Sequence, residues 1–236
     1  MKINRVRLAS AIRKIVWSID IPFTHISTSS IHVDLGAGNS PRNPFSAAKL
    51  IATDMHKSFT RHDGVEFVLA DLTRSLPFAS DTISSFSAYD VLEHIPRWER
   101  VDGEIQFPFI NLMSEVHRCL IPGGIFLSVT PAYPNAEAFQ DPTHVNIISK
   151  GTIRYFAAPE PWATLTGYGF VGSFHVITQT WLRGAGPYSG ESLTKLYRDQ
   201  GLKTKSKVSL KFICRTLKLF RNRKPTHLLW VLQKLD

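Results

Sequence analysis

The sequence predicts an α/β fold: a doubly wound, mostly parallel seven-stranded sheet with helices on both faces, in a single domain of residues 1–236. Short apolar stretches with the spacing of strands alternate with turns and helical stretches, which is typical of a parallel sheet. Several of these stretches end at an aspartate. Ligands of such sheets bind over the carboxyl ends of the strands. The length fits one large domain.

Seven stretches carry the strand pattern, and a helix pattern lies between the fourth and the fifth of them. The predicted strands cover residues 31–35, 50–53, 65–69, 83–88, 125–130, 172–182 and 226–232. A helix is expected over 107–120, where apolar residues recur at helical spacing and Pro-Gly-Gly at 122–124 would end it. Only a short helix is expected between the first two strands, because Pro41 and Pro44 interrupt that segment.

The chain from Ile31 to Asn39 predicts a buried strand that ends in a ligand-binding turn. It reads Ile-His-Val-Asp-Leu-Gly-Ala-Gly-Asn. Glycine permits positive φ and leaves space for a ligand against the main chain, and Asp34 just before the turn can hold a cationic or hydroxyl-bearing group. Asp54 follows about 20 residues later, where nucleotide-binding βαβ folds place an acid on the ribose hydroxyls. Pro41 breaks the dinucleotide glycine pattern, which disfavours NAD and leaves another adenosine ligand.

Four aspartates fall at the ends of predicted strands, and solubility alone does not explain so many acids at one edge. They are Asp34, Asp54, Asp71 and Asp90. They belong to a series of short motifs in residues 31–135. The motifs are Val33-Asp-Leu-Gly-Ala-Gly38, Ala52-Thr-Asp54, Ala70-Asp71 with Leu76-Pro-Phe78 and Asp81, Asp90-Val-Leu-Glu-His94, and Leu120-Ile-Pro-Gly-Gly124.

In their order and spacing these motifs resemble those of class I S-adenosylmethionine-dependent methyltransferases (type-11-like). Tyr133 and the sequence Gln-Asp-Pro-Thr-His at 140–144 look like methyltransferases of bacterial surface-polysaccharide gene clusters. The resemblance implies a Rossmann-like methyltransferase fold with S-adenosylmethionine as the cofactor.

The resemblance also implies where the cofactor binds. The glycine turn would hold the methionine part, with Asp34 near its amino group. Asp54 would accept from both ribose hydroxyls, Asp71 from the adenine amino group, and Leu72 would cover the adenine ring. The cofactor-binding residues implied are Asp34, Gly36, Ala37, Gly38, Asp54, Met55, Asp71, Leu72 and Asp90.

Two histidines are candidates for a catalytic base. A sugar hydroxyl is a poor nucleophile at neutral pH, and a general base contributes typically about 10²–10⁴-fold. His144 is the first candidate and His94 the second, because imidazole titrates in the useful range. The sequence that ends at His144 could instead begin a helix, with Asp141 or Thr143 as its cap.

No metal is expected from the sequence. The run Asp90–His94 resembles one that binds a divalent metal in some small-RNA and quinone-precursor methyltransferases, but such a run more often caps a helix and lines the cleft. Beyond it, Tyr155, Phe156 and Trp162 could form an acceptor wall or belong to the core.

The net charge of +9 is concentrated in residues 191–224, where eleven Lys and Arg residues face only Glu191 and Asp199. This segment lies within a basic insertion, residues 184–224, before the last strand. Its apolar stripe beside lysines predicts a basic amphipathic helix, either docked on the domain or bound to an anionic membrane surface. A pyrophosphate-bearing substrate is another anionic partner. Nucleic acid is disfavoured, because regularly interleaved aromatics are lacking.

Residues 1–20 predict an amphipathic helix, packed on the domain edge or serving a membrane-surface or homodimer contact. No apolar run is long enough to span a membrane. Cys119 and Cys214 have no metal-ligand spacing, so reduced thiols in a cytoplasmic protein are expected, with attachment to the inner membrane face left open.

The expected function is O-methylation of a sugar or glycan intermediate of cell-surface polysaccharide synthesis. A methyltransferase of a small lipid-soluble or quinone-like acceptor is an alternative. A non-catalytic binding protein on a methyltransferase fold is another, which the intact cofactor motifs disfavour.

Overall fold

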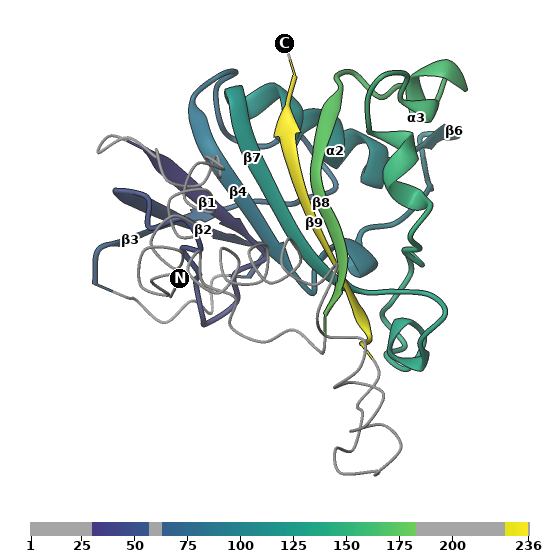
Figure 1. The fold of residues 1–236 in the computed structure, drawn as a ribbon, viewed down its shortest axis with the longest axis horizontal. Coiled ribbons are helices and arrows are strands. Elements are labelled where there is room, and N and C mark those ends of the chain that lie inside the picture. The colour runs from purple at the N-terminus through teal and green to yellow at the C-terminus, as the bar shows by residue number, and fades with distance from the viewer. Residues whose placement is uncertain (1–29, 57–62, 183–224, 236) are drawn as a thin grey trace, which may run out of the picture.

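The computed structural model describes residues 30–56, 63–182 and 225–235 (Figure 1). The expected helix of residues 1–20 and the basic insertion 184–224 lie outside these residues. What the sequence predicts of them, including the homodimer and membrane contacts, stays a prediction. Within the described part of the chain, no helix is both long enough and apolar enough to cross a membrane.

The described strands form a seven-stranded sheet in the order β3-β2-β1-β4-β7-β9-β8, which Figure 1 shows from one edge to the other. The strands are β1 (Ile31–Leu35), β2 (Lys49–Asp54), β3 (Val65–Leu69), β4 (Ile83–Tyr89), β7 (Leu120–Pro131), β8 (Phe174–Leu182) and β9 (His227–Lys234). Strands β3, β2, β1, β4 and β7 are parallel, and β9 is antiparallel to both β7 and β8. The predicted mostly parallel seven-stranded sheet is confirmed.

The winding of the sheet changes direction between β1 and β4. The chain moves outward from β1 through β2 to β3, and then returns to β4 on the other side of β1. Crevices at such switch points, over the carboxyl ends of the strands, are the usual ligand sites of doubly wound sheets. The predicted ligand-binding turn therefore lies beside the switch point.

Both faces of the sheet carry buried apolar side chains, as expected for central parallel strands. Along β7, Phe126 belongs to one apolar cluster and its neighbour Leu127 to the other. Helix α2 (Pro108–Cys119) packs in the first cluster, behind the sheet in Figure 1. Its proline lies in the first turn, where backbone N–H groups have no partner within the helix, so the N–H that proline lacks costs no hydrogen bond. The helix predicted over 107–120 is confirmed, one residue shorter at each end.

The remaining regular elements are short and lie in the connections. They are the hairpin of β5 (Glu99–Val101) and β6 (Glu104–Gln106), the helix α3 (Trp162–Leu165), and the 3₁₀ helices η2 (Leu92–His94), η3 (Ala136–Ala138) and η4 (Thr152–Tyr155). Of these, η2 matters most for the site, because it follows β4 directly at the carboxyl edge of the sheet.

Two local predictions are wrong. The segment between β1 and β2 contains turns and no helix, and Asn43 and Ala47 close one of them by exchanging two hydrogen bonds of 2.9 Å. Prolines 41 and 44 lack an N–H and disfavour helical conformation in the preceding residue, which explains the loss. Strand β7 begins at Leu120 instead of 125, so the Pro-Gly-Gly sequence lies inside the strand as an irregularity.

A chain of buried polar groups joins β1 to β4. The two ring nitrogens of His32 each lie 2.8 Å from a serine hydroxyl, Ser85 at Nδ1 and Ser87 at Nε2. Ser87 donates its hydroxyl to Asp34 Oδ1 at 2.5 Å. His32 Nε2 therefore donates to Ser87, and Nδ1 accepts from Ser85. Burial lowers the pKa of His32 to about 3, so the ring is neutral and fits this arrangement.

Replacing Asp34 by asparagine should change how stability depends on pH. Burial raises the pKa of Asp34 to about 6, from an ordinary value of 3.8. The stability that the protonated carboxyl contributes is present below about pH 4 and is lost as pH rises through about 6, roughly 3 kcal/mol in total. Urea unfolding from pH 4 to 7 should show the difference between wild type and Asp34→Asn changing by that amount.

His32 contributes to the pH dependence of stability with the opposite sign, because burial lowers its pKa. Both proteins retain His32, so its contribution cancels in the difference between them. Asparagine at position 34 can accept only with its one amide oxygen, so it cannot pair with both Ser87 and the N–H of Arg42. The stability lost in this way does not depend on pH. The pH dependence of the difference is therefore the result to read, and a constant difference would contradict the burial of a protonated Asp34.

Candidate active site

The turn after β1 is built around two glycines in the left-handed region. Gly36 has φ +60° and Gly38 has φ +52°. The backbone N–H of Ala37 donates to Thr53 O at 2.9 Å, and that of Gly38 donates to Asp54 Oδ2 at 3.1 Å. The turn is thus tied to the end of β2, which brings together two parts of the chain that the sequence predicts separately as cofactor contacts.

The two glycines are needed for different reasons. A Cβ on Gly36 would lie 2.6 Å from Val91 Cγ2, whereas a Cβ on Gly38 would meet no atom within 4 Å. Open space beside Gly38, next to a backbone N–H and a carboxylate, is what a ligand lying against the main chain requires.

Alanine at position 36 should therefore destabilise the protein more than alanine at 38. Both variants bear a positive-φ strain of order 1 kcal/mol, but only Gly36→Ala adds the overlap with Val91, which should bring its total loss to about 2–4 kcal/mol. Urea unfolding without ligand measures both, and Gly38→Ala serves as the matched control. Equal losses of stability in the two variants would show that the Val91 side chain moves aside at no cost in free energy.

The acids of the predicted nucleotide site lie along the carboxyl edge of β1, β2 and β3, as expected. Asp54 ends β2, and its Oδ1 accepts from the backbone N–H of His56 at 3.0 Å. Met55 beside it is exposed. Asp71 follows β3 and is exposed, with Oδ1 accepting from the backbone and the hydroxyl of Thr73. Leu72 is buried in the main apolar cluster.

Asp34 has a different environment from the one expected. Its side chain is 2% exposed, Oδ1 accepts from Ser87, and Oδ2 accepts from the backbone N–H of Arg42 at 2.8 Å. The carboxyl therefore joins the segment after the glycine turn, through Arg42, to strand β4, through Ser87. The expectation that it meets the cofactor's amino group is not supported by this placement, because its oxygens are enclosed by the chain.

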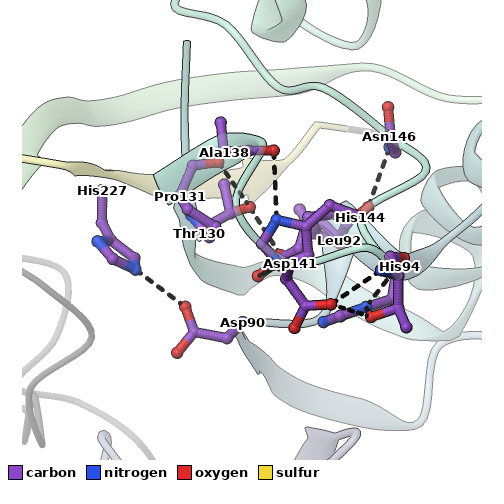
Figure 2. Close-up of polar contacts among 12 residues, drawn as sticks. Asp90, Leu92, His94, Thr130, Pro131, Ala138, Asp141, His144, Asn146 and His227 are labelled. Carbon is purple, nitrogen blue, oxygen red and sulfur yellow. Dashed lines mark hydrogen bonds and ion pairs between the residues drawn. The ribbon is translucent and has the colours of Figure 1, made fainter. Parts of the chain in front are cut away.

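Asp90 follows β4 and adopts a left-handed conformation, with φ +54°. Its Oδ1 lies 3.2 Å from Nε2 of His227, the first residue of β9. Figure 2 marks this pair with a dashed line. Non-glycine residues with positive φ are uncommon, and they concentrate at functional sites.

Glu93, His94 and His144 form a cluster, here called the histidine cluster, at the same edge. The rings of the two histidines lie 4.9 Å apart between centroids, and His144 Nε2 lies 4.0 Å from Glu93 Oε1. His144 Nδ1 is 3.2 Å from the carbonyl oxygen of Ala138, and His94 faces the loop of Asp141 (Figure 2). The structure thus brings together the two histidines that the sequence singled out separately.

Backbone hydrogen bonds fix the loop of His144 against η2. The N–H groups of Val145 and Asn146 both donate to Glu93 O at 2.9 Å. The Asn146 side chain donates to Leu92 O at 3.0 Å and accepts from Arg97 Nε at 2.9 Å. These contacts join residues about 50 positions apart, and they hold His144 beside Glu93.

The alternative that Asp141 begins a helix is wrong. Asp141 instead closes a tight turn, with Oδ1 accepting from the N–H of Thr143 at 2.8 Å and from its hydroxyl at 2.7 Å. Of the downstream aromatics, Phe156 is buried in the core and Trp162 is exposed, and an acceptor wall at these residues stays a prediction.

Three partners of the site were missed in the sequence. Thr130 donates to Glu93 Oε2 at 2.8 Å, His227 pairs with Asp90, and Ser87 binds Asp34. These three residues lie on strands whose sequence pattern predicts burial but no partner. The order and register of the strands determine which side chain each of the three contacts.

The fold is that of Rossmann-like methyltransferases, as predicted. Among similar solved structures is the methyltransferase found in complex with the Haloferax volcanii Trm112 methyltransferase activator. It has a TM-score of 0.50, 14% sequence identity, and a match over 95% of this chain and 89% of that chain. YcgJ from Bacillus subtilis has a TM-score of 0.50 and 15% identity over 94% and 99% of the two chains.

The same fold is found in the [4+2]-cyclase SpnF, with a TM-score of 0.50 and 15% identity over 96% of this chain and 81% of that chain. No family model and no curated protein matches the chain. Likeness at such low identity concerns the fold alone, so the function is argued from the residues of the site.

Proposed function

We propose that the chain is an S-adenosylmethionine-dependent methyltransferase that acts on a hydroxyl of a sugar or glycan intermediate of cell-surface polysaccharide synthesis. The observation that carries the proposal is the turn at Gly36–Gly38, which is left-handed at both glycines and hydrogen-bonded to Asp54. It lies at the same edge of the sheet as the histidine cluster. A cofactor site and an acceptor site would thus adjoin.

The residues present fit the cofactor. The open space beside Gly38 would take the methionine part, and Asp54, whose Oδ2 accepts from the N–H of Gly38, would also accept from the ribose hydroxyls. Asp71 and Met55 are exposed further along the same edge, where adenine would lie. When bound, the cofactor supplies the electrophilic methyl group on its sulfonium.

The histidine cluster would serve the acceptor. The contact of His144 Nδ1 with a carbonyl oxygen leaves Nε2 free to accept the proton of the acceptor hydroxyl. As the cofactor's methyl group passes to the hydroxyl oxygen, Nε2 of His144 would take up the proton that the hydroxyl loses. The protein's further task is to align the two reactants and exclude water.

Aromatic side chains near this cluster support a sugar as the acceptor. Tyr133 and Phe139 are 55% and 53% exposed, and their rings pack edge to face with centroids 6.4 Å apart. Exposed aromatic rings can pack against the C–H face of a sugar ring. The carboxylate of Asp141, on the same loop, can accept a hydrogen bond from a sugar hydroxyl.

The charge of residues 191–224 agrees with such an acceptor. Glycan intermediates carried on a lipid pyrophosphate lie at the inner membrane face, and anionic surfaces attract Lys and Arg at about 1 kcal/mol each. We include in the proposal that the protein works in the cytoplasm at that surface.

Incubation with methyl-labelled S-adenosylmethionine and fractionated cell extract tests the proposed function. Label in a carbohydrate or glycolipid fraction is the expected result. Label in a quinone fraction would contradict the glycan acceptor and retain methyl transfer. Calorimetry that shows no heat with S-adenosylmethionine or its demethylated product would overturn the whole proposal and favour a non-catalytic protein.

A further inference from the structure

We propose that Glu93, His94 and His144 bind a divalent first-row transition-metal ion. Each residue offers one ligand atom, and the three atoms lie within 4.8 Å of one another. The sequence predicted no metal here, because a run like Asp90–His94 more often caps a helix, and it did not show that the loop of His144 lies against η2. The geometry points the other way.

The first observation that favours an ion is an unpartnered carboxylate oxygen. Glu93 is 1% exposed, and its Oε1 has no hydrogen-bond partner among the described residues. Its Oε2, in contrast, accepts from Thr130 Oγ1 at 2.8 Å. Leaving a buried acceptor unpaired is unfavourable. A cation at Oε1 would remove that cost, while Thr130 would hold the carboxylate in place, as outer-sphere partners of metal ligands do.

The second observation is the tautomer of the two rings. His144 Nδ1 donates to Ala138 O, so its Nε2 carries the lone pair and lies toward Glu93. His94 Nδ1 has two neighbours, Thr143 O at 3.3 Å and Thr143 Oγ1 at 3.0 Å. That hydroxyl already donates to Asp141, so both neighbours act as acceptors and Nδ1 carries the proton. Metal-binding imidazoles are oriented in this way.

The donor set indicates the class of ion. Two imidazoles and one carboxylate suit Zn²⁺, Mn²⁺ or Co²⁺, whereas Mg²⁺ and Ca²⁺ prefer oxygen ligands. Donors about 2.1 Å from an ion lie about 3.3 Å apart, whereas the ligand atoms here lie within 4.8 Å of one another, so the cluster must contract by up to about 1.5 Å. The exposed His94 ring has room for that movement. Three protein ligands leave coordination positions open, as in catalytic metal sites.

The role of the ion rests on the proposed function, although its binding does not. An acceptor hydroxyl at an open position would become more acidic, and its proton would pass to water at the exposed side of the cluster. With an ion bound, His144 would be a ligand and would no longer serve as the base described under the proposed function.

Titration of the full chain with Co²⁺ tests the site, because its visible absorption reports nitrogen coordination. We expect one stoichiometric site in wild type, and at least a tenfold weaker one in each of His94→Ala, His144→Ala and Glu93→Gln. His175→Ala, which removes an exposed histidine of β8, is the control and should bind as wild type does. His94 is also exposed, so its variant should fold even where Glu93→Gln does not.

The outcomes separate this inference from the proposed function. Wild type without a stoichiometric Co²⁺ site, or cluster variants that bind Co²⁺ as tightly as wild type, would overturn the metal site, while S-adenosylmethionine titration still tests the function. Co²⁺ binding without S-adenosylmethionine binding would retain the site and overturn the function. Loss of label transfer on chelation, restored by Zn²⁺ or Mn²⁺, would support the catalytic role, and transfer that persists in chelator would reject it.

Discussion

Replacing Asp54 by alanine is expected to weaken S-adenosylmethionine binding by about 2–4 kcal/mol, or roughly 30- to 1000-fold in Kd. The carboxylate ends β2 and already fixes the glycine turn through the N–H of Gly38. In the proposed complex it also accepts from both ribose hydroxyls, and charge-assisted bonds of this kind contribute about 1.5–3 kcal/mol each. Exposure to water reduces their sum.

Calorimetric titration measures the effect directly. Asp54→Asn keeps one acceptor oxygen and should lose less, and Glu104→Ala, at an exposed acid of β6, should bind as wild type does. If Asp54→Ala binds within a few-fold of wild type, the ribose is held elsewhere and the position of the proposed cofactor is wrong.

Replacing His144 by glutamine is expected to lower kcat by about 100-fold or more, with little change in cofactor affinity. Glutamine can donate to Ala138 O, but it cannot accept a proton at neutral pH as Nε2 of imidazole does. The expectation holds whether Nε2 acts as a base or as a metal ligand, since both uses need its lone pair.

Single-turnover measurement with saturating cofactor separates the chemical step from binding. His175→Gln is the control outside the site. A rate within a few-fold of wild type would show that transfer depends on alignment alone or on His94. A raised Kd for the cofactor would instead show that the loop of His144 supports the cofactor site.

The sheet could be predicted because its strands are local patterns. The strands from β1 to β4 follow the predicted positions closely, and the acids at their ends lie on the carboxyl edge. The early start of β7 could not be read, because Pro122 and two glycines usually interrupt structure. A paired neighbour, Ile83 opposite Leu120, extends the strand there.

The site could be predicted only in part, because its partners come from distant segments. The two histidines were found as separate candidates. Their meeting depends on backbone bonds from Val145 and Asn146 to Glu93, which no spacing in the sequence encodes. The burial of Asp34 was hidden for the same reason, since it depends on Ser87 in a neighbouring strand.

The position of β9 between β7 and β8 has a consequence for the order of folding. Strand β9 follows both of its neighbours in the sequence, yet it pairs with β8 over its whole length and with β7 over residues 227–233. While the chain is being synthesised, the half of the sheet from β3 to β7 can form before residues 227–234 exist. Until then β7 has an unpaired edge, and Asp90 lacks His227. We therefore expect strands β3, β2, β1, β4 and β7 to form first, and the pairing of β9 with β7 and β8 to be a late, non-local step.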